Sequence, residues 1–255
     1  MKKTFINLLV AATILFLAGC EKNKDYTATF DRVAPTNSLL KVIYASAYSL
    51  NPLVQLSIDD VRVSGLITGR TPFPGGGYNT SGSNFPDYLS LTPGNKKLSV
   101  AIPKRGTNVD SIVLFSTQIT LENAKNYTLN ISDTLAKTKA LLVVDSVEQP
   151  AAGTVKYRFV NLMPNVPKID LYYNSLRVAT SVPYNTEGVV FSTPVFIAGT
   201  WSIRETGTLP TSTALATFAT GSTIANQRMF TAFAMGYKGA TTTTLRPYIS
   251  FTINF

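Results

Sequence analysis

Beyond residue 36, apolar and polar residues alternate in short runs that turn-forming residues interrupt. The clearest run covers residues 246–255, where Ile249, Phe251 and Ile253 alternate with polar neighbours. Successive side chains of a strand point to opposite faces of the sheet, so a period of two predicts half-buried strands. No convincing helical period occurs in this part of the chain. The pattern therefore predicts an all-β protein.

Two tight hairpins are predicted from their central residues. Asp59-Asp60 separates the runs 54–58 and 61–63, and Asn174-Ser175 occupies the matching position between two later runs. Asp and Asn tolerate the positive φ that a two-residue turn requires. About seven short strands per hundred residues, joined by regular turns, are typical of an immunoglobulin-like β-sandwich.

The chain contains an internal repeat in three collinear blocks. One block is the pattern Y-N-T-x-G-x-x-F, present at 78–85 and again at 184–191. Fixed self-similarity of this kind indicates repeated structural units. We predict two tandem immunoglobulin-like β-sandwich domains, 37–148 and 153–255, joined by a short linker. The other aligned blocks are 40–65 with 155–180, and 115–128 with 218–231.

The first residues have the layout of a secretory signal. Met1-Lys2-Lys3 is followed by an apolar run that ends in Leu17-Ala18-Gly19-Cys20. That run is too short to span a bilayer, which takes roughly 20 residues. The last four residues closely resemble the bacterial lipobox, in which the Cys is acylated and becomes the first mature residue. We expect a signal peptide over 1–19 and a lipidated tether over 20–36. The alternatives are an ordinary signal peptide that happens to end in Cys, and a signal anchor.

Composition excludes several function classes. The chain has no His, and Cys20 is its one Cys. Ser-His-Asp and Cys-His catalysis are therefore excluded, as are the common zinc sites and any intramolecular disulfide. A carboxylate pair could still serve a glycosidase, but no acidic dyad stands out among Asp170, Glu187 and Glu205. We predict no catalytic residues, no metal and no cofactor.

The net charge of +9 comes from dispersed Lys and Arg residues. It suits contact with anionic lipid headgroups or acidic glycans, and equally an ordinary solvated surface. Nucleic acid is disfavoured as a partner by the predicted export and by the lack of a binding motif.

An inserted segment, 70–78, is the most unusual part of the chain. It is rich in Pro and Gly, and the nine extra residues of the first repeat fall around 67–77. Loops on rigid scaffolds often carry function, so Phe73 and Tyr78 are the candidate ligand-binding residues. The alternative is that Phe73 packs onto its own domain or the neighbouring repeat. Two further candidates are weaker. Asp59-Asp60 could bind calcium but fits a turn better, and Trp201 fits a core better than a sugar platform.

Several of these residues together carry a family resemblance. The chain resembles the bacterial domain-of-unknown-function family 4397, often found as tandem copies in surface lipoproteins of the Bacteroidetes. The first repeat departs from the pattern, with Ser49 where Pro is expected. The resemblance implies an extracytoplasmic β-sandwich and carries over no catalytic residue. The motifs are R-F-V-N-x-x-P at 158–164, I-D-L-Y-Y at 169–173, Y-N-T-x-G-x-x-F at 184–191, aliphatic-A-G at 197–199 and aromatic-Thr at 230–231.

These observations favour a non-catalytic cell-envelope lipoprotein that acts as a binding or structural module. It would be held at the outer membrane, surface-exposed, by lipid on Cys20, with an unknown protein or glycan partner. One alternative is a glycan-binding accessory lipoprotein of a polysaccharide uptake system. The other is a pilus-like or stalk assembly subunit, since sandwich domains can polymerise by strand exchange.

Overall fold

The computed structural model describes residues 34–80, 85–107, 109–146, 148–195, 198–219 and 223–254. Nearly all of them belong to one compact unit, Thr36–Phe255. The predicted signal peptide, Cys20 and most of the predicted tether lie outside the described residues. No helix in the described ranges is long and apolar enough to cross a membrane.

The N-terminal half of this unit, residues 36–146, forms two sheets. One has the order β10-β9-β1-β4, with β6 also paired to β1, and the other has the order β3-β2-β7-β8. A single 3-10 turn, η1 (Leu135–Lys137), follows β9. The strands are β1 (Ser38–Tyr44), β2 (Gln55–Ile58), β3 (Val61–Arg62), β4 (Pro72–Phe73), β6 (Leu89–Leu91), β7 (Gly94–Pro103), β8 (Asp110–Leu121), β9 (Asn126–Ser132) and β10 (Lys139–Asp145).

The C-terminal half, residues 148–254, repeats this arrangement. Its sheets have the orders β14-β11-β17-β18 and β13-β12-β15-β16. In each half the opening strand pairs in parallel with the penultimate one, β1 with β9 and β11 with β17. The strands are β11 (Thr154–Asn161), β12 (Lys168–Tyr173), β13 (Leu176–Pro183), β14 (Val189–Pro194), β15 (Thr200–Glu205), β16 (Ala216–Ala219), β17 (Met229–Met235) and β18 (Tyr248–Ile253).

The predicted all-β sandwich architecture is confirmed. Its strand order has one particular feature: β1 and β11 pair with a late strand of their own half. In an immunoglobulin constant domain the first strand instead lies beside the second. The domain boundaries at 148 and 153 stay predictions, because residues 36–255 form one compact unit.

The period of two along the strands builds one core inside each half. Leu40, Val42 and Tyr44 of β1 point toward the sheet that contains β2 and β7, and pack against Leu56 and Val100. In the C-terminal half, Tyr157, Phe159, Trp201 and Phe251 pack in the corresponding core. Burial of these apolar side chains between two sheets is the main stabilising contribution in each half.

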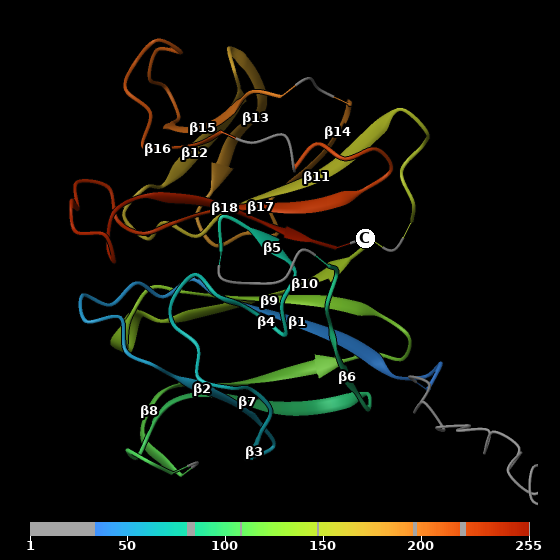
Figure 1. Ribbon diagram of the computed structural model, residues 1–255, viewed down its shortest axis with the longest axis vertical. Helices are drawn as coiled ribbons and strands as arrows, with labels where there is room; N and C mark the ends of the chain where they lie inside the picture. The colour runs from blue at the N-terminus through green and yellow to red at the C-terminus, as the bar shows by residue number, and fades with distance from the viewer. Residues whose placement is uncertain are drawn as a thin grey trace, which may run out of the picture. The chain divides into compact units, whose positions relative to one another are not determined.

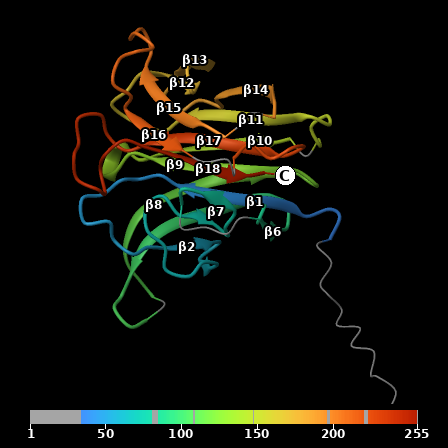
Figure 2. The ribbon, with the colours of Figure 1, turned by 45° about the horizontal axis from the view of Figure 1, so that its top comes forward.

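The two halves also share a third apolar cluster. The residues of β1 that point away from the first core, such as Ile43, meet Val160, Leu162, Phe233 and Met235 of the C-terminal half. The central sheets of the two halves therefore pack face to face, with both of their faces covered. Figures 1 and 2 show the result as successive layers of sheet within this unit.

The inserted segment 70–78 links the two halves. Its first piece, β4, pairs with β1. Its second piece, β5 (Gly77–Tyr78), instead pairs with β18 and extends the central sheet of the C-terminal half. Arg70 reinforces this link, because its guanidinium donates to the Thr243 carbonyl at 2.7 Å and lies 4.0 Å from the Tyr248 ring centroid.

The hairpin turns form at the residues that the sequence indicates. Asp59 and Asp60 have φ of 49° and 64°, so both occupy the left-handed region that a two-residue turn needs. The Asp59 carboxylate accepts the Lys97 backbone N–H at 2.9 Å. Asn174, with φ of 51°, accepts the Thr200 N–H at the same distance. In both halves a side-chain oxygen of the turn thus accepts a backbone N–H from the neighbouring strand.

Candidate functional site

The loops that follow β1, β9, β11 and β17 lie at one end of the unit, which we call the distal end. Strands β1 and β9 run parallel, so the loops after Tyr44 and Ile131 leave the same edge of their sheet. Strands β11 and β17 do the same in the C-terminal half. The strand that opens the unit, β1, begins at the opposite edge, at Ser38 (Figure 1).

A cleft of about 530 Å³ lies at the distal end where the two halves meet. This volume falls in the range of small-ligand sites. Because both halves supply its walls, the cleft depends on how they pack together. The lining residues are Asp133, Ala136, Lys137, Thr138 and Lys139 from the N-terminal half, and Pro164, Asn165, Tyr184 and Tyr237 from the C-terminal half.

Two half-buried tyrosines are fixed in this cleft by hydrogen bonds that cross between the halves. The Tyr237 hydroxyl donates to Asp133 Oδ1 at 3.0 Å. The hydroxyls of Tyr184 and Ser132 lie 3.1 Å apart and share a hydrogen bond. Burial raises the pKa of both tyrosines, so both remain neutral phenols at physiological pH. The cleft therefore holds two oriented aromatic rings.

Two further contacts shape the cleft. The Asn165 side-chain amide exchanges two hydrogen bonds with the backbone of Lys238, each of 2.9 Å, which braces the loop after β17. The Lys139 ammonium lies 5.2 Å from the Tyr184 ring centroid. A cation near an aromatic ring is attracted by the ring quadrupole, so this lysine is held over the cleft.

A second hollow of about 460 Å³ lies on the N-terminal half. Its walls combine aliphatic side chains, such as Leu53 and Leu66, with Lys104 and Arg105. Its lining contains no aromatic ring, so it offers no stacking surface of the kind found in the distal cleft.

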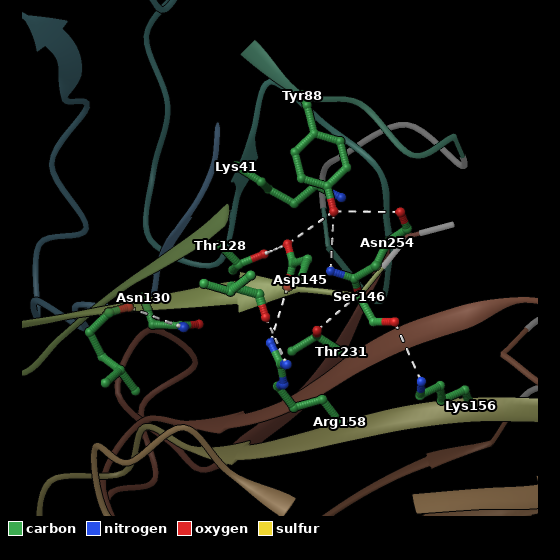
Figure 3. Close-up of polar contacts among 12 residues, drawn as sticks. Lys41, Tyr88, Thr128, Asn130, Asp145, Ser146, Lys156, Arg158, Thr231 and Asn254 are labelled. Atoms are coloured by element: carbon green, nitrogen blue, oxygen red, sulfur yellow. Dashed lines mark hydrogen bonds and ion pairs between the residues drawn. The ribbon is translucent and has the colours of Figure 1, made fainter. Parts of the chain in front are cut away.

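The space between the central sheets also contains a buried polar group, the interface cluster, shown in Figure 3. Asp145 Oδ2 accepts from the hydroxyls of Tyr88 and Thr128, and Asp145 Oδ1 accepts from Arg158 Nη1 at 3.1 Å. Lys41 donates to the Ile253 carbonyl, with its ammonium 4.6 Å from the Tyr88 ring centroid. We define the interface cluster as Lys41, Tyr88, Thr128, Asp145, Arg158 and Asn254.

Burial dominates the electrostatics of the interface cluster. Desolvation lowers the pKa of Lys41 to about 8, opposed by the nearby carboxylates of Asp145 and Asp87. Desolvation also raises the pKa of Asp145, opposed by its Thr128 hydrogen bond and by Arg158. The Asp145 side chain is only 1% exposed, so the cluster is inaccessible to a ligand. Its role is to join the two halves.

The structure places the predicted residues Phe73 and Tyr78 on different cores. Phe73 packs against the core of the N-terminal half, and Tyr78 packs against that of the C-terminal half, 6.0 Å from the Phe230 ring. The two rings therefore do not form one platform. Ligand binding by this segment stays a prediction, and Cys20 lies outside the described residues.

The other sequence candidates have structural partners. Trp201 is buried, donates to Thr223 Oγ1 at 2.8 Å and contacts the Tyr173 ring edge-on. Asp59 and Asp60 form ion pairs with Lys96 and Lys97. Asp170 accepts the Ser181 N–H at 2.7 Å and pairs with Arg177. In the described ranges no cluster of three potential metal-ligating side chains from His, Cys, Asp or Glu occurs.

Sequence reasoning missed the distal cleft because its residues come from four distant segments. One signal was present: Tyr184 opens the second copy of the Y-N-T-x-G-x-x-F block. The first copy, however, places Tyr78 on β5, where it serves packing. The repeat alone could not show which copy leaves its tyrosine beside a cleft.

The fold and the cleft together define an all-β sandwich protein with a ligand-sized hollow between two similar halves. Residues 77–172 match the family model described as Domain of unknown function (DUF4397). This match confirms the predicted family resemblance over that segment. It begins in the N-terminal half and ends in the C-terminal half, so it does not test whether the chain holds two copies of the family domain.

A search of curated proteins found no match. Among solved structures, one similar chain is titled "Alpha-glucan binding by a streptococcal virulence factor". It is 12% identical, the alignment covers 65% of this chain and 79% of that chain, and the TM-score is 0.23. A TM-score this low carries no information about the fold or ligand of the present chain.

Proposed function

We propose that this protein is a non-catalytic binding module of the cell envelope that binds carbohydrate in the distal cleft. The observation that carries the proposal is the pair Tyr184 and Tyr237, oriented in a 530 Å³ cleft by hydrogen bonds from the opposite half. Ordering these rings before a ligand arrives reduces the entropy lost on binding.

The chemistry of the cleft suits a sugar. One face of a pyranose ring presents C–H groups, which pack on the electronegative face of an aromatic ring. The hydroxyls at its rim need hydrogen-bonding partners, and Thr138, Asn165 and the lysines supply polar groups around the rings. A purely apolar ligand would displace water from these polar groups without replacing its hydrogen bonds, which costs binding free energy.

The residues support binding rather than catalysis. The chain has no His to act as a general base near neutral pH. The acid that lines the cleft, Asp133, already accepts hydrogen bonds from Tyr237 and from the Thr134 N–H. The buried acids Asp145 and Asp170 are likewise engaged in hydrogen bonds and ion pairs.

The lipobox-like Leu17-Ala18-Gly19-Cys20 supports anchoring through the N-terminus. Cys20→Ser should abolish the incorporation of radiolabelled palmitate into the protein in expressing cells. Absence of label from the wild type would contradict lipid anchoring.

The main test is a glycan-binding screen on residues 21–255, made without the lipid site Cys20. Tyr184→Ala/Tyr237→Ala should abolish binding. Tyr184→Phe/Tyr237→Phe should weaken binding without abolishing it, because the rings remain but lose the hydrogen bonds that orient them. Phe85→Ala is the matched control, since Phe85 is an exposed aromatic residue outside the cleft. Absence of binding by the folded wild type, or full binding by the alanine variant, would contradict the proposal.

One observation favours assembly as a second function. Strand β8 is a 12-residue edge of its sheet, and its residues 111–121 include no charge and no Pro. Long uncharged edges invite pairing with another chain. Ser116→Lys/Gln118→Lys should then reduce self-association measured by light scattering. A wild type that stays monomeric at high concentration would count against assembly.

A further inference from the structure

We infer that the distal cleft selects an acidic sugar, one that carries a carboxylate or a sulfate. The inference rests on the proposed function, because it specifies the ligand class of the same cleft. It comes from the arrangement of charge around the two tyrosine rings.

The lining of the cleft has a positive balance. Lys137 and Lys139 both belong to it, against the single acid Asp133. Neither lysine forms an ion pair with any residue that the structure describes. The Asp133 carboxylate already accepts two hydrogen bonds at Oδ1, from the Tyr237 hydroxyl at 3.0 Å and from the Thr134 N–H at 2.8 Å. The charge available to a ligand is therefore cationic.

The cations stand beside the stacking surface. Lys139 lies over one face of Tyr184, so its ammonium is beside the ring surface that it leaves open, on which a pyranose would pack. Lys137 lies on η1 and Lys139 begins β10, so both are attached to ordered backbone. A ligand that combines a pyranose face with an anionic substituent satisfies the ring and the lysines together. A neutral sugar would use the ring and leave both charges unpaired.

The aromatic rings also separate an acidic glycan from other polyanions. An acidic peptide could pair with Lys137 and Lys139 through carboxylates, but its extended backbone offers no flat C–H face to the tyrosines. Poly-glutamate is therefore the probe that distinguishes simple charge attraction from recognition of a sugar acid.

The test compares polygalacturonate with its methyl ester, which has the same sugar backbone but uncharged, methylated carboxyl groups. Chondroitin sulfate is the sulfated probe and poly-glutamate is the peptide probe. Wild-type residues 21–255 should bind at least one acidic glycan more tightly than the ester and poly-glutamate. Lys137→Ala/Lys139→Ala should lower that affinity about tenfold and reduce its salt dependence, as expected for the loss of two partly exposed ion pairs. Lys96→Ala/Lys97→Ala is the control, since this lysine pair lies on β7 and pairs with Asp59 and Asp60. It should bind like the wild type.

The outcomes separate this inference from the proposed function. If the ester binds as well as the acid, and only the tyrosine variant loses binding, the cleft binds sugars without charge selection and the inference is wrong. Tight binding of poly-glutamate would overturn it as well. If no glycan binds to the folded protein, the proposed function fails together with the inference.

Discussion

Asp145 is a buried carboxylate at the centre of the interface cluster, where it faces two cations. Replacing it with Ala would leave Arg158, whose side chain is 10% exposed, without its counter-charge. It would also remove one of the two carboxylates that act on the buried Lys41. Removing one partner of a buried pair typically costs about 3–5 kcal/mol. We expect Asp145→Ala to lower the free energy of unfolding by that amount in urea titrations.

The control for this substitution is Asp60→Asn, which removes the charge and keeps a residue type that tolerates the positive φ of this turn. Asp60 forms an exposed ion pair with Lys97, with side chains 75% and 42% exposed. Such pairs contribute about 0–1 kcal/mol, so the stability should change little. An Asp145→Ala variant as stable as this control would show that the interface cluster does not hold the halves together.

Lys41 gives the stability a dependence on pH. Its pKa falls from an ordinary 10.5 to about 8 on folding, because burial disfavours the charged ammonium. Between these values the unfolded chain binds more protons than the folded one, so stability rises as the pH rises through this window. The depressed pKa corresponds to about 3 kcal/mol that is regained once Lys41 is neutral in both states. Tyr88, whose pKa burial raises, opposes the gain only near and above pH 10.

The measurement is the difference in unfolding free energy between the wild type and Lys41→Met from pH 7.5 to 9.5. Met keeps the length and apolar stem without the charge, and Asp145, Asp87, Arg158 and Tyr88 are common to both proteins. The wild type should gain stability relative to the variant as the pH increases. A constant difference across this range would mean that Lys41 keeps its ordinary pKa when buried.

At the residue scale, the alternation of apolar and polar residues predicts which face of a strand a side chain belongs to. It does not predict which residues of other segments pack against that face. Lys41 and Lys156 occupy equivalent positions in the repeat. Lys41 is fully buried under Tyr88, whereas Lys156 is half-exposed and points toward Ser146. The difference comes from the neighbouring half. For the same reason the sequence could not bring Tyr237 and Asp133 together.

At the scale of elements, Gly77 allows β5 to lie against β18. A Cβ at this position would come 2.6 Å from the Phe251 carbonyl oxygen and 2.9 Å from Thr80 Oγ1. Gly77→Ala should therefore push β5 away from β18 and cost about 1–3 kcal/mol, the usual range for overpacking. Urea unfolding measures the loss, and faster hydrogen exchange at β18 amides would localise it.

Gly65→Ala is the matched control. A Cβ there meets no atom within 4 Å. Removing a glycine at such a position reduces the entropy of the unfolded chain, so the stability should stay constant or rise slightly. Equal losses in the two variants would show that close approach of β5 to β18 is not the cause.

The strands themselves could be predicted wherever a local signal exists. The period of two locates β1, β2, β11, β12 and β18, and the Asp59-Asp60 pair locates a turn. Strand β5 has no such signal, because two residues are too few for a period. It forms only because it pairs with β18, and this pairing depends on how the two halves pack together.

At the scale of the whole molecule, the shared apolar cluster, the interface cluster and β5 all join the two halves. A typical interface between domains within one chain is polar and permits relative motion. Here the halves bury charged and apolar side chains against each other, including Lys41, Ile43 and Phe233. We expect them to unfold as one cooperative unit, which also keeps the walls of the distal cleft in register.

Phe233→Ala tests this coupling, since Phe233 is fully buried in the apolar cluster between the halves. The substitution should cost about 3–5 kcal/mol. Trp201 fluorescence reports unfolding of the C-terminal half. In a Trp201→Phe/Phe115→Trp background the new Trp reports unfolding of the N-terminal half, because Phe115 packs against the core of that half.

If the halves are coupled, both probes give one urea midpoint. Phe233→Ala then lowers both midpoints equally, because neither half keeps its covered face when the other unfolds. A midpoint that falls for the probe in the C-terminal half and stays unchanged for the probe in the N-terminal half would mean that the halves are independent. The distal cleft would then lie between mobile parts, and its tyrosines could not be held in place before a ligand binds.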